Sequence, residues 1–401
     1  MTYLRREKLL PLVKPMIGKN EIAEVVDSLK SGWITTGPKT IKFEEMLSAY
    51  NNVSYCLVMN SATTAQEIAM QLLNLAPGDE VITTSMTWVS TLNTIVLQGG
   101  IPVLVDIDPI TLNIDPTKIE AAVTSRTRGI IPVHLAGLPV SMNPIWDIAG
   151  KYNLWVVEDA AQAMGAKYHD KKIGSDPRSI FSIYSFQANK NITTGEGGAL
   201  VIHNERFVDK VKQLRFHGIN RETPKYFNEY TKVPVDVIEP ARKANFMDIQ
   251  AAIGIHQLKE LDSFNTRRRY LFHRYIELMK DVEEITLPTT GDSEHGHCYH
   301  LFAIRINAKK AKIDRDTFML RLREENISTG IHYRPVHTQS FYQSYYSNKH
   351  HHAIPKDGLP HTELIGNNIL SLPLWPGLTE LDQNQVIAAI LHTLAKAKNQ
   401  K

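Results

Sequence analysis

Leu154-Trp-Val-Val-Glu158, followed directly by Asp159-Ala-Ala-Gln162, is the stretch of sequence that says most about the fold. Its continuous apolar run is typical of a strand buried on both faces, as in a parallel sheet covered by helices. An acid that follows such a strand lies at the carboxyl edge of the sheet, where α/β proteins bind ligands. The alternative is that Asp159 caps the next helix. The stretch predicts a buried parallel strand with a polar, ligand-facing end.

Similar short apolar runs recur on both sides of this stretch and alternate with helical patterns. The runs cover 55–59, 80–84, 102–106, 129–133, 180–184 and 198–202, and the helical patterns cover 64–73, 89–98, 116–123 and 144–151. Alternation of this kind predicts an α/β fold with a three-layer, mostly parallel sheet. The last two runs leave no room for a helix between them, so we expect an antiparallel hairpin there.

A second, smaller unit is expected after residue 250. Residues 219–246 lose their periodicity and read as a long loop, and two helices over 248–261 and 267–279 follow. Further strands are expected over 299–306 and 368–372, with helices over 315–325 and 383–397. We therefore predict a large α/β domain with an N-terminal arm over 1–250 and a small α/β domain over 251–401.

Composition excludes several classes of protein. Of the 401 residues, 43% are hydrophobic and 22% charged, which excludes disorder, collagen and coiled coil. The 45 basic and 42 acidic residues give a net charge of only +3, too balanced for a nucleic-acid or membrane surface. The two cysteines, Cys56 and Cys298, fit a reducing compartment, and no signal peptide or membrane span is evident. We expect a cytoplasmic protein.

Two stretches at predicted strand ends have the residue types of a phosphate and ring site. Asn60-Ser-Ala-Thr-Thr64 places small and hydroxylated residues at a helix start, where backbone N–H groups can receive a phosphate. The alternative is an ordinary Ser or Thr N-cap. Trp88 could stack on a flat heteroaromatic ring, the alternative being a partly buried core tryptophan.

A lone lysine, Lys190, lies in a polar turn between the two runs that we expect to pair, five residues after Ser185. A lysine held away from the surface has a depressed pKa and can act as a Schiff-base amine. With the phosphate cup, the acid Asp159 and the ring of Trp88, this amine completes the set of groups that pyridoxal phosphate requires.

Three other motifs could suggest a dinucleotide or metal site, but each is interpreted otherwise. Gly195-Glu-Gly-Gly198 is not a dinucleotide fingerprint, because Leu200 stands where the third glycine should be. His297 and His300 are interpreted as a structural pair, and His350-His-His352 as a solvated turn. No metal site is expected.

At these residues the chain resembles the fold-type I pyridoxal-phosphate enzymes, and within them the DegT/DnrJ/EryC1/StrS family of nucleotide-sugar aminotransferases. The similarity runs from 31–38 to 371–376, and the stretches 85–93, 131–137 and 330–339 are most similar to the enzymes that form UDP-4-amino-4-deoxy-L-arabinose for lipid A, a lipopolysaccharide component. The resemblance implies that Lys190 is the Schiff-base and proton-transfer residue and that Asp159 pairs with the pyridine nitrogen.

The resemblance also implies the other site residues. Cofactor contacts are implied for Ser61, Ala62, Thr63, Trp88, Gln162, Ser185 and, from the other subunit of a homodimer with shared active sites, Asn245. Substrate contacts are implied for Thr36, His332, Tyr333 and Arg334. The alternatives are a structural loop histidine at 332 and a helix-cap role for Asn245.

The implied reaction moves an amino group from L-glutamate, which leaves as 2-oxoglutarate, to a UDP-linked 4-keto sugar. Gln162 and Gln187 replace histidines of the most similar relatives, and 219–240 departs from the arabinose enzymes, so the sugar is left open. The rival interpretations are a pyridoxal-phosphate sugar dehydratase or lyase, which the presence of Lys190 disfavours, and a non-catalytic regulatory homologue, which the intact set of Lys190, Asp159 and Ser185 disfavours.

Overall fold

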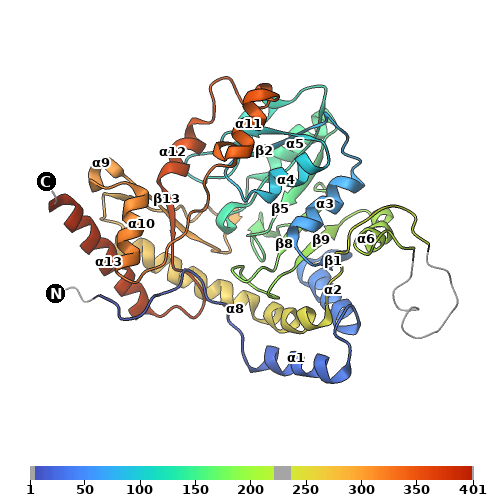
Figure 1. The fold of residues 1–401 in the computed structure, drawn as a ribbon, viewed down its shortest axis with the longest axis horizontal. Helices are drawn as coiled ribbons and strands as arrows, with labels where there is room; N and C mark the ends of the chain where they lie inside the picture. The colour runs from blue at the N-terminus through green and yellow to red at the C-terminus, as the bar shows by residue number, and fades with distance from the viewer. Residues whose placement is uncertain (1–4, 221–235, 400–401) are drawn as a thin grey trace.

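The computed structural model describes residues 5–220 and 236–399. Its main feature is a seven-stranded sheet in the order β1-β9-β8-β5-β4-β2-β3 (Figure 1). The strands are β1 (Tyr55–Met59), β9 (Gly198–Ile202), β8 (Phe181–Ser185), β5 (Trp155–Asp159), β4 (Thr127–Ile130), β2 (Glu80–Thr84) and β3 (Ile101–Val105). Only β9 runs antiparallel to its neighbours, β1 and β8. The predicted mostly parallel sheet and the hairpin of β8 with β9 are confirmed.

Helices cover both faces of this sheet, which explains why its strands are apolar throughout. On one face lie α2 (Pro38–Asn51), α5 (Met142–Tyr152) and the first part of α8 (Asp248–Met279). On the other face lie α3 (Ala62–Leu72) and α6 (Val208–Leu214). Every residue of β2 and β8 is buried. The prediction of a three-layer arrangement is confirmed.

A second core surrounds a three-stranded antiparallel sheet of β10 (Ile285–Thr286), β12 (Phe302–Ile306) and β13 (Ile369–Leu372). Helices α10 (Arg315–Glu324), α13 (Glu380–Asn399) and the end of α8 pack on it. Leu10 of the N-terminal segment is buried in this core. Tyr342 and Tyr346 of α11 (Ser340–Asn348) are instead buried in the core of the main sheet. A division into domains 1–250 and 251–401 remains a proposal.

The predicted break between two helices at 262–266 is wrong, because α8 is one helix of 32 residues. Polar side chains of this stretch form hydrogen bonds to backbone oxygens. Thr266 Oγ1 donates to Asp262 O at 2.8 Å, and Asn265 Nδ2 donates to Met164 O at 3.2 Å. The bond of Asn265 to Met164, which is distant in the sequence, therefore helps this polar stretch to remain helical.

Several other elements differ from the prediction. The helix expected over 116–123 is a pair of 3₁₀ turns, η1 (Pro116–Lys118) and η2 (Glu120–Ala122), and β4 begins two residues earlier than the run at 129–133. Of the predicted loop over 219–246, residues 221–235 lie outside the described residues. The remaining α-helices and strands that the structure describes are α1 (Lys19–Ser31), α4 (Ser90–Leu97), α9 (Ala308–Ala311), α12 (Pro360–Asn368), β6 (Lys167–Tyr168), β7 (Lys171–Lys172) and β11 (His295–Gly296). Within the described ranges, no helix is long and apolar enough to cross a bilayer.

Candidate active site

A cavity of about 400 Å³ opens at the carboxyl ends of β5 and β8, beside the N-terminus of α3. Its volume lies within the range of about 300–1,000 Å³ of ligand pockets. Ten of the predicted site residues line it: Ser61, Ala62, Thr63, Trp88, Asp159, Gln162, Ser185, Lys190, His332 and Tyr333. Ten further residues line it: Gln187, predicted only to differ from the most similar relatives, and nine with no predicted role, Gln66, Thr87, Ser90, Val133, Ala161, Ile183, Asn189, Glu196 and Gly197.

The N-terminus of α3 forms one end of the cavity. Ser61 caps the helix, because its Oγ accepts from Thr64 N at 3.1 Å, so the N-cap alternative describes this hydroxyl correctly. The N–H groups of Ala62 and Thr63 come before the first helical bond and remain available to an anion. The helix end sits directly on β9 at Gly198, where an added Cβ would lie 2.3 Å from Ala62 N. A glycine at this position therefore brings the helix end to the edge of the sheet.

Asp159 ends β5 and is 7% exposed. Its Oδ2 accepts from Thr91 Oγ1 at 2.8 Å, and Thr91 in turn bonds Thr87 Oγ1 at 2.9 Å. Its Oδ1 accepts from Ala161 N at 3.2 Å within a turn. No helix lies between β5 and β6 in this described part of the chain, so the alternative that Asp159 caps a helix is wrong. A carboxylate has about four acceptor positions. Since Asp159 lines the cavity, the remaining ones are available to a ligand.

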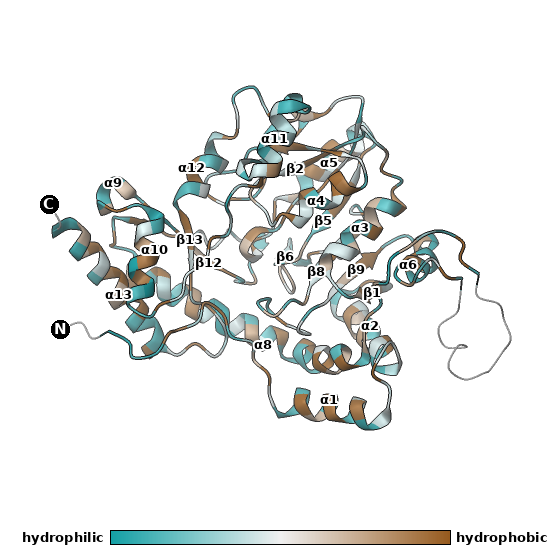
Figure 2. Ribbon diagram, viewed as in Figure 1, coloured by the Kyte–Doolittle hydropathy of each residue, from teal (hydrophilic) through white to brown (hydrophobic). Residues whose placement is uncertain are grey.

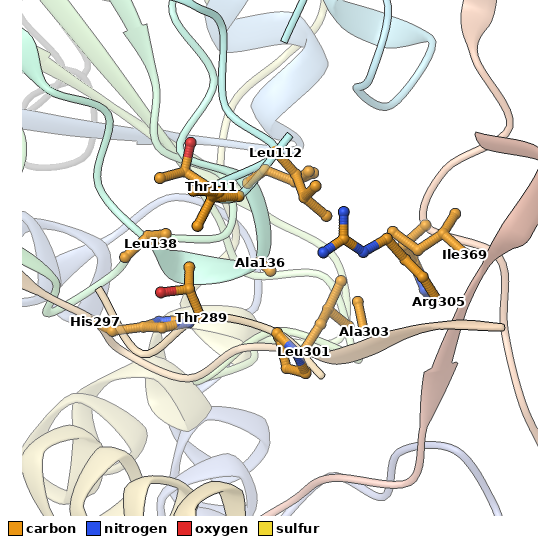
Figure 3. Close-up of a pocket in the computed structure, with 14 residues that line it drawn as sticks. Thr111, Leu112, Ala136, Leu138, Thr289, His297, Leu301, Ala303, Arg305 and Ile369 are labelled. Atoms are coloured by element: carbon orange, nitrogen blue, oxygen red, sulfur yellow. The ribbon is translucent and has the colours of Figure 1, made fainter. Parts of the chain in front are cut away.

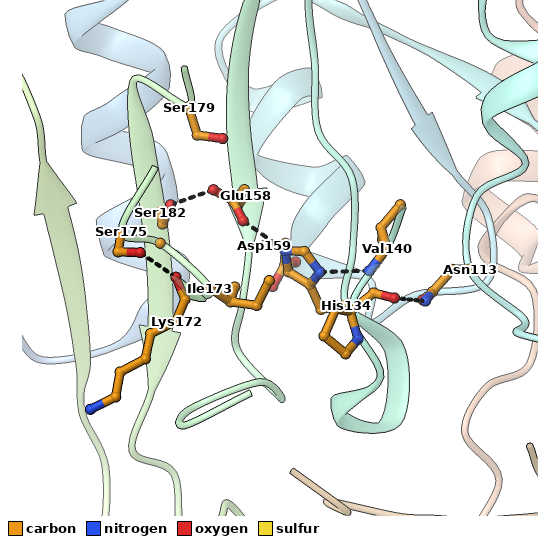
Figure 4. Close-up of polar contacts among 12 residues, drawn as sticks. Asn113, His134, Val140, Glu158, Asp159, Lys172, Ile173, Ser175, Ser179 and Ser182 are labelled. Atoms are coloured by element: carbon orange, nitrogen blue, oxygen red, sulfur yellow. Dashed lines mark hydrogen bonds and ion pairs between the residues drawn. The ribbon is translucent and has the colours of Figure 1, made fainter. Parts of the chain in front are cut away.

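Behind Asp159 lies a buried network that fixes the end of β5 (Figure 4). His134 Nε2 and Glu158 Oε2 are 3.0 Å apart, and Ser182 Oγ donates to the other oxygen of Glu158 at 3.1 Å. Because His134 Nδ1 accepts from Val140 N at 3.0 Å, the ring proton is on Nε2 and is donated to Glu158. His134 N also donates to Asp159 O at 3.1 Å. The strand end and the following turn are thereby held together.

The orientation of the Gln162 amide is set by two neighbours. Its Oε1 accepts from Ala136 N at 2.7 Å, and its Nε2 donates to Tyr333 Oη at 2.5 Å. Because a backbone N–H can only donate, the oxygen must face Ala136. Ala136 has φ of 57°, in the left-handed region, within the turn η3 (Leu135–Gly137). One N–H of Gln162 is left for a ligand in the cavity.

Lys190 lies in the turn that joins β8 to β9, where its backbone N–H donates to Gln187 O at 2.9 Å. Burial lowers the pKa of Lys190 to about 8, because the surrounding protein disfavours the charged ammonium, and the negative charge of Asp159 opposes this shift only in part. A substantial fraction of the amine is therefore neutral near physiological pH.

We expect the rate at which the cofactor-free protein takes up pyridoxal phosphate to rise with pH and to level off above about 8. Only the neutral amine attacks an aldehyde, and a lysine with a depressed pKa becomes neutral at lower pH than an exposed one. Stopped-flow absorption at a series of pH values measures the rate, with Nα-acetyl-lysine as the reference amine. A protein rate that still rises toward pH ~10.4, the value for free lysine, would contradict this expectation.

Trp88 is 60% exposed, so the alternative of a core tryptophan is wrong. The centroid of its ring lies 6.0 Å from that of Tyr333, with 50° between the ring planes. An exposed indole in a cavity wall offers a flat apolar face to a ligand.

His332 and Tyr333 line the cavity and are joined by a cis peptide bond. His332 Nδ1 lies 2.9 Å from Ser371 Oγ. Burial lowers the pKa of His332 to about 4, and the charge of Lys190 adds to the shift, so the imidazole is neutral. Arg334 does not line the cavity; its Nη2 donates to Thr338 O at 2.8 Å.

Thr36 and Asn245 contact each other and do not line the cavity of their own chain. Asn245 Nδ2 donates to Thr36 Oγ1 at 2.8 Å, and Thr36 Oγ1 donates to Phe246 O at 2.5 Å. Asp248 holds this region, because its carboxylate accepts from the backbone N–H of Gly37 and Thr40 at 2.8 and 2.9 Å. Their roles toward cofactor and substrate remain predictions.

A second, much smaller cavity of about 30 Å³ shares the wall at His332 (Figure 3). It holds about one water molecule and no larger ligand. His297 in its wall accepts from Tyr299 N at 2.9 Å and stacks on that ring at 4.4 Å, and His300 Nδ1 lies 3.0 Å from Asn191 Oδ1. These contacts agree with a structural histidine pair. In the described part of the chain, no cluster of three His, Cys, Asp or Glu side chains could hold a metal.

Two amide side chains in the wall of the larger cavity each have a buried polar atom that forms no hydrogen bond with the described residues. Gln66 Nε2 and Asn189 Oδ1 have no hydrogen-bond partner among the residues that the structure describes. Buried polar atoms are nearly always paired, so such atoms in a cavity wall indicate a ligand. The cavity thus offers an anion site, a carboxylate, a neutral amine, an amide N–H and a flat ring, which fit the phosphate, ring nitrogen, aldehyde, ring hydroxyl and ring face of pyridoxal phosphate.

Comparisons with known proteins agree with this chemistry. The model of the DegT/DnrJ/EryC1/StrS aminotransferase family matches residues 15–391. MJ1066, an uncharacterised protein of Methanocaldococcus jannaschii, is 42% identical over 387 residues, which cover 96% of this chain and 97% of that protein.

Among solved structures, Spr1654 of Streptococcus pneumoniae, described as a candidate sugar aminotransferase in its PMP-form, is 29% identical with a TM-score of 0.87 and covers 97% of this chain and 100% of that one. Its PLP-form is also similar, with a TM-score of 0.85, 28% identity and coverage of 97% and 99%. PseC of Helicobacter pylori, an aminotransferase of pseudoaminic acid biosynthesis, is 26% identical with a TM-score of 0.87 and coverage of 97% and 100%. The expected fold-type I aminotransferase architecture is confirmed.

Proposed function

This chain belongs to the DegT/DnrJ/EryC1/StrS aminotransferase family, and we propose that it transfers the amino group of L-glutamate to the 4-keto carbon of a nucleotide-linked sugar. Its cofactor is pyridoxal 5′-phosphate, which matched structures hold in PLP and PMP forms. The observation that carries the proposal is a lysine amine of depressed pKa, Lys190, in one cavity with Asp159.

The cofactor would be held by residues from several elements. Its phosphate would lie at the N-terminus of α3, against Ser61, Ala62 and Thr63, with Ser185 beside it. Asp159 would accept from the ring nitrogen and Gln162 would donate to the ring hydroxyl. Trp88 would cover one face of the ring.

When bound, pyridoxal phosphate supplies an aldehyde that accepts the amino group and a ring that takes up the electron pair of the broken C–H bond. Lys190 would act first as the amine that holds the aldehyde and then as the base that moves the proton between substrate and cofactor carbons. Asp159 would keep the ring nitrogen protonated, because its carboxylate stabilises the positive charge there.

A sugar acceptor is supported by polar groups of the cavity wall. Asn189 Oδ1 is a buried acceptor without a partner among the described residues, and it suits a hydroxyl donor. His332, held neutral, and Tyr333 would line the sugar, as would Thr36 and Arg334 from the rim or from a second subunit. UDP is the nucleotide that the arabinose-type stretches favour.

The test is a transamination screen with glutamate against UDP-, dTDP- and GDP-linked 4-keto sugars, following 2-oxoglutarate release and the mass of the sugar product. One amino sugar formed with stoichiometric 2-oxoglutarate supports the proposal. Loss of water from the sugar without 2-oxoglutarate would instead identify a dehydratase, and protein that takes up no cofactor would identify a regulatory homologue.

A homodimer with shared active sites is supported by an apolar stripe on α1. Ile22, Val26 and Leu29, spaced four and three residues apart, are 58%, 40% and 56% exposed. Figure 2 shows the brown of hydrophobic residues along α1, which lies at the edge of the molecule in this view. Contiguous exposed apolar residues of this kind mark interaction surfaces. Asn245, which does not line its own cavity, would reach the phosphate of the neighbouring subunit.

We expect a mixture of Lys190→Ala and Asn245→Ala chains to recover activity that neither variant has alone. If Asn245 serves the neighbouring subunit, a hybrid dimer contains one site with both changes and one site with neither. Co-expression with two affinity tags isolates the hybrid, and each parent homodimer is the control. A hybrid with no more activity than its parents would show that Asn245 acts within its own chain.

A further inference from the structure

We infer that Gln66 is a phosphate-binding residue, with its side-chain amide donating a hydrogen bond to the cofactor phosphate. Gln66 lies in α3, three residues after Thr63 and four after Ala62, on the helix face that borders the cavity. Residues at these spacings are neighbours on a helix surface. The Gln66 side chain therefore extends the anion site one helical turn beyond the first N–H groups.

Gln66 is buried although no described residue accepts a hydrogen bond from its side-chain Nε2. The residue is 2% exposed, and its Nε2 has no hydrogen-bond partner in the part of the chain that the structure describes. A buried amide donor in that state is costly to the fold. Its presence in a cavity wall is explained when the bound molecule supplies the acceptor.

Among the acceptors of pyridoxal phosphate, the phosphate oxygens fit Gln66 best. The ring hydroxyl is already assigned to Gln162, and the protonated ring nitrogen is a donor that faces Asp159. A phosphate carries about −1.5 to −2 charges and three strong acceptor oxygens. In contrast, Lys190 is the only lysine or arginine in the described cavity wall, so neutral donors must supply the remaining bonds. This inference rests on the proposed placement of the phosphate at α3.

The experiment replaces Gln66 by methionine, which has a similar length and a similar preference for helix. The dissociation constant of pyridoxal phosphate, measured by absorption and fluorescence titration of the cofactor-free protein, is expected to rise about 10- to 100-fold, as for loss of a hydrogen bond to a charged group. Gln71→Met on the same helix is the matched control, because Gln71 Nε2 already lies 3.5 Å from Glu239 Oε2, and its affinity should stay unchanged. Gln66→Glu, which places a negative charge beside the phosphate, should weaken binding further.

Binding of pyridoxal, which lacks the phosphate, tests whether Gln66 contacts the phosphate or another part of the cofactor. Gln66→Met should bind pyridoxal as tightly as the unmodified protein does. Equal losses for both ligands, or no loss for pyridoxal phosphate, would overturn the inference. Thermal unfolding without cofactor gives a second readout, because removal of an unpaired buried amide should leave Gln66→Met at least as stable as the unmodified protein. Lower stability without cofactor would point to a structural role and would also overturn the inference.

Failure of the proposed function can be distinguished from failure of the Gln66 inference. If the unmodified protein binds pyridoxal phosphate but transaminates no sugar, the proposed function fails while the Gln66 measurement still stands.

Discussion

Replacing Lys190 by alanine is expected to lower the rate of transamination by at least about 10⁴-fold. Proton transfer by a positioned side chain contributes ~10²–10⁴-fold, and loss of the amine that holds the cofactor aldehyde adds to this. The effect should be visible as glutamate-dependent 2-oxoglutarate release by the purified variant. Since the half-buried Lys190 lines the cavity and its pKa is lowered to about 8, no exposed lysine can replace it.

Two controls make the Lys190 result specific. Lys167→Ala removes an exposed lysine of β6 and should leave the rate unchanged. Added methylamine should raise the residual rate of Lys190→Ala in proportion to the concentration of neutral amine, because it supplies the missing base. After borohydride treatment of the holoprotein, the cofactor label should map to the peptide that contains Lys190. A label on another peptide, or a near-normal rate in the variant, would refute the assignment.

Replacing Asp159 by asparagine is expected to lower the rate about 10²-fold or more, with a shifted absorption band of the bound cofactor. The change keeps the shape of the side chain but removes the charge that faces the ring nitrogen. Loss of one partner from a buried ion pair costs about 3–5 kcal/mol, and ~1.4 kcal/mol corresponds to a factor of ten. Steady-state kinetics and absorption spectra measure both effects.

The pH dependence gives this variant an independent readout. Because the charge of Asp159 raises the pKa of Lys190, its removal should move the midpoint of cofactor uptake below about 8. Thr91→Val is the matched control: it removes one hydrogen bond to Asp159 but keeps the charge, so the midpoint of cofactor uptake should stay near 8. Unchanged spectrum, rate and midpoint in Asp159→Asn would remove this residue from its proposed role.

The fold was predictable because each buried strand is marked by a short apolar run of neighbouring residues in the sequence. The runs at 55–59, 80–84 and 198–202 coincide with β1, β2 and β9, since a strand buried on both faces must be apolar throughout. The helix α8 was divided in the prediction because bonds from Asn265 to distant backbone cannot be read from neighbouring residues. Tertiary contacts of this kind override local preference.

Part of the site was predictable, because an acid directly after a buried strand and a lone lysine in the turn after another have few other roles, as with Asp159 and Lys190. Gln66 and Thr91 were missed for different reasons. Thr91 follows Trp88 by three residues, and its bond to Asp159 crosses 68 positions of sequence. Gln66 carried a readable signal, because it is a polar residue among the apolar buried positions of its helix. Only the structure reveals that its Nε2 has no partner among the residues described.

Among the described residues, Gln66 Nε2 and Asn189 Oδ1 have no partner, so we expect the stability of the folded chain to depend on the supply of its cofactor. A ligand that binds only the folded chain stabilises it by about 2.7 kcal/mol at a hundred times its dissociation constant. Chains that remain empty lack that gain and are open to proteases for more of the time. A cell short of vitamin B6 should therefore contain less of this protein, through faster degradation and without any change in its synthesis.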